Sequence, residues 1–202
     1  MTARKGKLIA IDGCAGDPVK AAARGVAQTL RAAIGSGGVS GWDASGIFTE
    51  ISSADSVIEA VSARTLTLLY AADLAFRVRW QIGPALEAGE SVIAAPYVES
   101  AKALAIAAGL PRKWLDELFA FAPKPSVCYR VSPARAAEGA RSSSGYVEWF
   151  TDALTSDGNG VSPANLRAKS AEYLDALQAR RSCRLLTPQE IRRLSRGSRR
   201  RR

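Results

Sequence analysis

The pattern with the clearest chemical meaning is residues 13–20, GCAGDPVK, which follow the short apolar run 8–11. A helical pattern comes next, with apolar residues at i, i+3 and i+4 spacing as far as Ile34. A loop in this position binds phosphate when it has the spacing G-x-x-x-x-G-K-[ST]. Its backbone N–H groups and lysine contact phosphate oxygens, and its hydroxyl contacts magnesium. Here Gly13 keeps the first glycine, while proline, valine and lysine occupy the last three positions.

These replacements weaken each part of that chemistry. Pro18 has no N–H group to donate, and Val19 carries no charge. We expect Asp17 to cap a helix that begins at Pro18, so that its carboxylate takes the N–H groups that a phosphate would need. Lys20 leaves an alternative open, because it could reach a phosphate if the loop shifted; a solvent-facing lysine is the competing interpretation. The predicted equivalent of a phosphate loop is Gly13, Cys14, Ala15, Gly16, Asp17, Pro18, Val19 and Lys20.

Composition limits the other kinds of chemistry. A chain of 202 residues, 47% hydrophobic and 23% charged, predicts one sizeable globular domain, and the absence of histidine excludes histidine-based catalysis. Cys14, Cys128 and Cys183 have no ligand spacing, so we expect inert buried thiols, no disulfide framework, no metal site and a reducing compartment. No apolar run approaches the roughly 18 residues of a membrane span. The chain is therefore predicted to be cytoplasmic, without membrane association.

The net charge of +9 is concentrated at the C-terminus. Residues 180–202 contain ten arginines and a single acidic residue, Glu190, whereas the remaining 18 basic and 18 acidic residues balance. We therefore predict a folded domain over residues 1–186 and an Arg-rich helix or tail over residues 187–202. Binding of nucleic acid would belong to the tail, and a disordered, solubilising tail is the equally weighted alternative. The candidate polyanion-binding residues are Arg192, Arg193, Arg196, Arg199, Arg200, Arg201 and Arg202.

Short apolar runs alternate with amphipathic segments along the chain, which predicts an α/β fold with a parallel sheet and helices on both faces. Ligands of such folds bind where the carboxyl ends of the strands meet. The expected strands are 8–11, a segment around 46–49, 91–95, 127–131 and 184–186. The expected helices are 18–34, roughly 54–88, 101–108, 112–119, 163–181 and a short segment from 187.

Three blocks of sequence, in order and at the right spacing, resemble thymidylate kinase, a P-loop nucleoside-monophosphate kinase, over about residues 5–178. The first is KLIAIDGCAGDPVKAAARGVAQTL, the second LTLLYAADLAFRVRWQIGPALEAGESVIAAPYVES and the third FAPKPSVCYRVSPARA. They are similar to the family's phosphate loop and first helix, its third helix and following strand, and a later strand and turn. The resemblance implies a three-layer, P-loop NTPase-like fold.

The resemblance also implies where functional residues should lie. Its nucleoside pocket corresponds to Tyr70, Asp73, Tyr97 and Glu99. Most charged positions of the family are replaced: the magnesium-associated Asp-Arg pair by Ala95-Pro96, the monophosphate-binding arginine by Leu74, and the loop acid by Ala15. The arginine after the second strand corresponds to Glu50 or is deleted. The lid motif DRxE corresponds to Gly145-Tyr146-Val147-Glu148, and a thymidine-side Tyr-Gln pair to Leu104-Ala105.

We therefore predict a pseudoenzyme of the nucleotide-kinase type that acts by binding nucleotide or protein. A single transition-state arginine contributes roughly 10³–10⁵ in rate, so the combined losses remove most of the catalysis. The family implies a homodimer formed through the helix at 54–88, or pairing with an active paralogue. The apolar side of this helix carries Leu66, Tyr70, Val78 and Ile82, and burial inside the monomer is the alternative interpretation of these residues. An active kinase that uses ATP and magnesium with relocated cations stays open. The cations available for relocation are Arg77, Arg79, Lys102, Lys124, Arg130, Arg135 and Arg141.

Overall fold

The structure is a computed structural model that describes residues 6–34, 38–53, 61–131, 145–155, 162–180, 182–187 and 189–191. Within these residues the strands form one parallel sheet with the order β2-β3-β1-β4-β5. The strands are β1 (Lys7–Asp12), β2 (Gly38–Gly41), β3 (Ser91–Ala95), β4 (Val127–Arg130) and β5 (Arg184–Leu185). The helices are α1 (Gly16–Ile34), α2 (Ile47–Ser53), α3 (Ala63–Arg77), the π-helix η1 (Val78–Ile82), α4 (Gly83–Glu87), α5 (Val98–Ala107), α6 (Arg112–Leu118), α7 (Tyr146–Thr155) and α8 (Pro163–Ala179).

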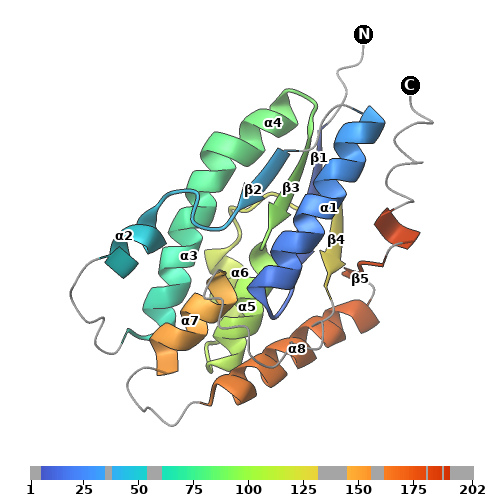
Figure 1. Cartoon of the computed structure of the whole chain (residues 1–202). Helices are drawn as coiled ribbons and strands as arrows, with labels where there is room; N and C mark the ends of the chain where they lie inside the picture. The colour runs from blue at the N-terminus through green and yellow to red at the C-terminus, as the bar shows by residue number, and fades with distance from the viewer. Residues whose placement is uncertain are drawn as a thin grey trace.

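Helices cover both faces of the sheet, as Figure 1 shows, so the predicted three-layer α/β fold is confirmed. Side chains alternate along each strand, and β1 therefore supplies apolar residues to both layers. Ile9 and Ile11 pack with Val26 of α1 on one face. Leu8 and Ala10 pack on the other face in the cluster that α3, α5 and α7 share. The chain passes from β1 directly into α1 and from β3 directly into α5, which places both helix N-termini at the same edge of the sheet.

The second strand lies earlier than predicted. Residues 46–49, predicted as a strand, contain a turn and the start of α2, and β2 is instead Gly38–Gly41. Asp43 explains the helix, because its carboxylate accepts hydrogen bonds from the N–H groups of Phe48 (2.9 Å) and Thr49 (3.0 Å). The first residue after β2 is thus Trp42, and Glu50 lies inside α2.

Two other helices differ from the expectation. α1 begins at Gly16, so Asp17 is its second residue and not its N-cap. The long helix expected at 54–88 is described from Ala63, with Ser62 as its N-cap, and it continues through η1 into α4. Gly83 allows the π-turn, because a Cβ there would lie 2.8 Å from the carbonyl oxygen of Val78. Helix α7 was not predicted.

Cys128 and Cys183 form a disulfide, which corrects the expectation of three inert thiols. The two residues are 55 positions apart in the sequence, but β4 pairs with β5, and this pairing brings their Cα atoms to 4.7 Å. Cys14 is the free cysteine, and it is buried. Burial raises the pKa of its thiol, so it stays protonated and unreactive at neutral pH.

Among the described residues, none of the helices has the length and apolar character needed to cross a bilayer.

Candidate functional site

The N-terminus of α1 is occupied by a carboxylate from the chain itself. The N–H of Gly16 donates to Oε1 of Glu148 at 2.9 Å and to Oε2 at 3.2 Å. Glu148 lies in the first turn of α7, and Gly145, immediately before that helix, packs against Gly16 backbone to backbone. A Cβ on Gly16 would lie 2.5 Å from Glu148 Oε2 and 2.8 Å from Gly145 Cα, so only glycine permits this approach. One donor at the anion-binding end of α1, the N–H of Gly16, is thus already satisfied within the chain.

A second N–H group of the loop, that of Gly13, is also engaged. The N–H of Gly13 donates to Ser100 Oγ at 3.0 Å, and that hydroxyl is in turn a donor to Asp12 Oδ1 at 2.8 Å. Val19, at the position of the phosphate-loop lysine, is 1% exposed and packs in the core beneath α1. Asp17 is exposed. The carboxylate observed on the N–H of Gly16 is that of Glu148, whereas the sequence suggested Asp17 as the capping residue.

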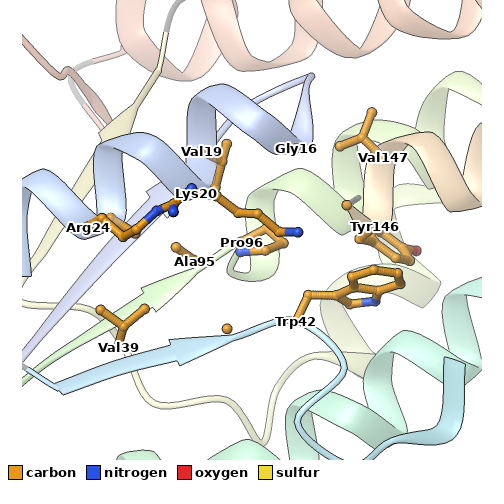
Figure 2. Close-up of a pocket in the computed structure, with 13 residues that line it drawn as sticks. Gly16, Val19, Lys20, Arg24, Val39, Trp42, Ala95, Pro96, Tyr146 and Val147 are labelled. Carbon is orange, nitrogen blue, oxygen red and sulfur yellow. The ribbon is translucent and has the colours of Figure 1, made fainter. Parts of the chain in front are cut away.

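A cavity of about 330 Å³ opens beside this loop, between α1, the carboxyl ends of β2 and β3, and the start of α7. Figure 2 shows Lys20 extending from α1 across Pro96, with Arg24 one turn further along the helix. Trp42 and Tyr146 form the aromatic wall. Ala95 and Pro96 place no carboxylate or guanidinium here, and no group of three metal-ligating side chains occurs within the described ranges. The lining of the cavity is thus basic and aromatic.

Tyr70, the predicted base-stacking residue, is covered by another aromatic side chain. Its ring centroid lies 4.3 Å from that of Tyr146, and Phe119 packs against it edge-on at 6.2 Å. Its hydroxyl donates to the carbonyl oxygens of Pro96 (3.1 Å) and Tyr97 (2.8 Å). Tyr70 is fully buried, and burial raises its pKa. The face on which a base would stack is thus taken by α7, the same helix that supplies Glu148.

Asp73 has a structural role in this fold. Its carboxylate accepts hydrogen bonds from the N–H of Asp43 (3.2 Å), the N–H of Ser45 (2.9 Å) and the hydroxyl of Ser45 (2.8 Å). One turn later Arg77, fully buried, donates to Ser40 and to the carbonyl of Pro96. Together these two residues fix the carboxyl ends of β2 and β3.

Tyr97 and Glu99, the other two predicted nucleoside-pocket residues, point elsewhere. The hydroxyl of Tyr97 donates to the carbonyl of Pro123 at 2.7 Å, and Glu99 accepts a hydrogen bond from Tyr173 of α8 at 2.8 Å. Both line a second cavity that does not include Tyr70. The four predicted residues are thus divided between two places in the fold.

None of the described cations proposed for relocation reaches the loop through a hydrogen bond or ion pair. Arg130 donates to Gln178 (2.8 Å) and pairs with Asp175, and Lys102 pairs with Asp116 at 2.7 Å. Arg77 is used inside the core as described, Arg79 lies over the ring of Trp80, and Lys124 lines the second cavity. Arg135, Arg141 and the tail arginines from Arg192 onward lie outside the described residues.

Sequence analysis gave no role to Glu148 and Tyr146 beyond a match to the family's lid motif, although both contact the site. No signal in the sequence pairs these segments, because Gly145 and Gly16 approach each other only when α7 packs beside α1.

No family model matches the chain. Two curated relatives are each named "Probable thymidylate kinase". That of Pyrococcus abyssi is 42% identical over 67 residues, 33% of both chains, and that of Thermococcus kodakarensis is 42% identical over 69 residues, 34% of both. The chain thus matches about a third of the length of these relatives. A crystal structure of thymidylate kinase from Ehrlichia chaffeensis superposes with a TM-score of 0.68 over 91% of this chain and 87% of that one, at 12% identity. These similarities support the assignment of this chain as thymidylate-kinase-like, with the fold of the Ehrlichia chaffeensis protein.

Proposed function

We propose that this thymidylate-kinase-like chain is catalytically deficient and acts by binding, not by transferring phosphate. The observation that carries the proposal is the contact of Glu148 with the N–H of Gly16 at 2.9 Å. A phosphate that entered the loop would need this donor and the positive end of the α1 dipole, both of which already hold a carboxylate. Displacing Glu148 would also bring two negative charges together, which is unfavourable.

The neutral side chains at the charged positions of the family support the same proposal. Val19 and Leu74 are core residues, 1% and 0% exposed, and Ala95 ends β3 without a carboxylate. Phosphoryl transfer depends on positioning and on neutralising charge in the transition state. With the lysine, the magnesium carboxylate and an arginine absent together, even strong non-additivity leaves little acceleration.

The test is titration calorimetry with dTMP and with ATP, each with and without magnesium, beside a coupled assay for ADP release. The probable thymidylate kinase of Pyrococcus abyssi is a suitable positive control for the assay. We expect no turnover above the uncatalysed rate. Turnover by the wild-type chain with both substrates would overturn the proposal, and binding of one nucleotide without turnover would identify its ligand.

The variant Glu148→Ala separates exclusion by Glu148 from loss of the catalytic residues. It frees the N–H of Gly16, so weak binding of inorganic phosphate should appear while turnover stays absent, because Val19 still supplies no charge. Glu148→Gln is the matched control, since its amide oxygen can keep the hydrogen bond and only the charge is removed. Turnover in Glu148→Ala would mean that the remaining residues suffice for catalysis.

We propose further that the chain self-associates through α3 and η1, the region that forms the dimer in the family it resembles. Leu66, Tyr70 and Ile82 are fully buried inside the monomer, which is the alternative that the sequence left open for them, so they are not available for an interface. The side that faces outward instead carries Leu68 (46% exposed), Phe76 (38%) and Trp80 (63%). An exposed apolar row of this kind is typical of a protein interface.

Sedimentation velocity of the wild-type chain and of Trp80→Glu tests this interface. The wild type should sediment as a dimer, and the variant as a monomer that melts at nearly the same temperature. Phe121→Glu is the control, because Phe121 is 45% exposed but lies on the loop after α6. A monomeric wild type, or equal behaviour of the two variants, would refute dimerisation through α3.

A further inference from the structure

The face of the sheet that packs against α1 is incompletely covered at its edge, inside the cavity of about 330 Å³. Val39 of the edge strand β2 pairs with Ile93 of β3, and Ile93 packs in the cluster beneath α1, so Val39 faces the same side of the sheet. Ile93 is 0% exposed, whereas Val39 is 41% exposed. The cavity therefore has an apolar floor that a ligand can reach from solvent, and its volume suits a small molecule.

Two cations from α1 line the wall above this floor. Lys20 and Arg24 stand one helical turn apart, so their side chains leave the same side of the helix. In Figure 2 Lys20 extends across Pro96, and Arg24 follows one turn later. Lys20 is half-buried and Arg24 is exposed, and no acidic side chain is among the described residues that line the cavity. Two positive charges within reach of solvent thus border an apolar surface, an arrangement that attracts an anion.

An aromatic wall stands at the carboxyl end of β2. The ring of Trp42 lies 5.0 Å from that of Phe48 and 6.3 Å from that of Tyr146, measured between centroids, so other aromatic side chains hold it in place. Trp42 is half-buried and lines the cavity. A planar ring that entered the cavity could therefore pack against the indole of Trp42.

We propose that this cavity binds a planar aromatic carboxylate, a ligand with one negative charge. Its carboxylate meets Lys20 and Arg24, while its ring lies over the apolar floor and against Trp42. The proposal deepens the proposed function, and it rests on that function only in that the chain acts by binding. The assay for ADP release decides whether phosphate is transferred and the titration below decides the ligand, so the two ideas can fail separately.

One negative charge fits this cavity better than the two of a phosphate ester. The carboxylate of Glu148 holds the N–H of Gly16 at 2.9 Å, and Gly16 also lines the cavity. This carboxylate repels a second negative charge at the same end of the cavity. A nucleotide is disfavoured for another reason, since the ring of Tyr146 covers that of Tyr70.

The test compares three probes that share one ring system, 2-naphthoate, 2-naphthamide and 2-naphthyl phosphate, by ¹⁵N-edited NMR titration of the full chain at millimolar concentrations. 2-Naphthoate should shift the amide signals of Lys20 and Gly41 and the indole N–H signal of Trp42, which line the cavity. The uncharged 2-naphthamide should bind about tenfold more weakly, because two exposed charge contacts of about threefold each are lost. Added salt should weaken binding of 2-naphthoate alone of these two. Equal affinities, tighter binding of the phosphate, shifts confined to other residues, or no shifts would each overturn the proposal.

Two variants at exposed positions make the test specific to the site. Arg24→Gln should weaken binding of 2-naphthoate about threefold, as expected for one exposed ion pair, and leave binding of 2-naphthamide unchanged. Arg31→Gln is the matched control, because Arg31 is an exposed arginine of the same helix that does not line the cavity, and its loss changes the net charge equally. Val39→Glu places a negative charge on the floor and should abolish binding of 2-naphthoate. Equal effects of the two arginine variants, or unchanged binding by Val39→Glu, would refute the site.

Discussion

The variant Gly16→Ala should detach α7 from α1, although alanine is normally the better helix former. The added Cβ would lie 2.5 Å from Glu148 Oε2, 2.8 Å from Gly145 Cα and 3.3 Å from Gly145 N, so α7 must move away and the charged hydrogen bond is lost. Gly25→Ala is the matched control on the same helix, because a Cβ at Gly25 meets nothing within 4 Å.

The expected magnitude follows from two terms. Gly25→Ala should stabilise the chain by about 1 kcal/mol through helix propensity. Gly16→Ala loses a charge-assisted hydrogen bond, about 2 kcal/mol, and gains little because it stands in the first turn of the helix. The two variants should therefore differ by about 3 kcal/mol, or roughly 6–12 °C in melting temperature for a chain of this size.

Differential scanning calorimetry measures the difference in melting temperature, and hydrogen exchange of residues 146–155 shows whether α7 has loosened. Faster exchange in α7 of Gly16→Ala, with unchanged exchange in Gly25→Ala, supports the contact between Gly16 and Glu148. If both variants gain stability equally and α7 exchanges as in the wild type, Glu148 does not hold α1 in solution, and the main support for a deficient kinase disappears.

Three further predictions concern other parts of the chain. Burial is the largest cause that raises the pKa of Asp12 from 3.8 to about 6. Asp12 therefore adds of the order of 3 kcal/mol to the free energy of unfolding below about pH 4, and this contribution is lost as the pH rises through 6. Urea unfolding of Asp12→Asn at a series of pH values should lack this decline in the free energy of unfolding. Thiol titration of the denatured, unreduced chain should find one free thiol, Cys14, and three after reduction, and reduction of Cys128–Cys183 should cost about 4 kcal/mol. Removal of residues 192–202 should abolish salt-sensitive binding of RNA in a shift assay if the tail binds polyanions; equal binding with and without the tail would contradict this.

The sequence predicts the central strands well because their burial leaves a strong apolar signal. β1 and β3 are buried at nearly every position, and both lie within one residue of the predicted ranges. The sequence did not predict the position of β2, and the reason is physical. This strand lies at the edge of the sheet, contains Gly38 and Gly41, and buries only Ser40. Its position depends on Arg77, which donates to the Ser40 hydroxyl and carbonyl from a helix 37 residues away. No local pattern encodes such a contact.

In the candidate site, too, some features can be read from the local sequence and others depend on contacts between distant residues. The absence of a lysine at Val19 and of an N–H at Pro18 is visible in eight residues of sequence. The occupation of the same helix end by Glu148 is not visible there, because the two residues are 132 positions apart and meet only when α7 packs beside α1. The Cys128–Cys183 disulfide likewise follows from the pairing of β4 with β5, not from cysteine spacing.

Helix α7 connects the two changes that distinguish this site from a nucleotide-binding one. Glu148 places a carboxylate on the N-terminus of α1, and Tyr146, two residues earlier, places its ring 4.3 Å from Tyr70. Because both side chains project from one helical turn, a shift of α7 would break both contacts together. The energies of the two contacts are therefore coupled, and Tyr146→Ala should weaken protection of α7 and thereby loosen Glu148. A double-mutant cycle of Tyr146→Ala with Glu148→Ala should give a stability loss smaller than the sum of the single losses; strict additivity would show that the two contacts form independently.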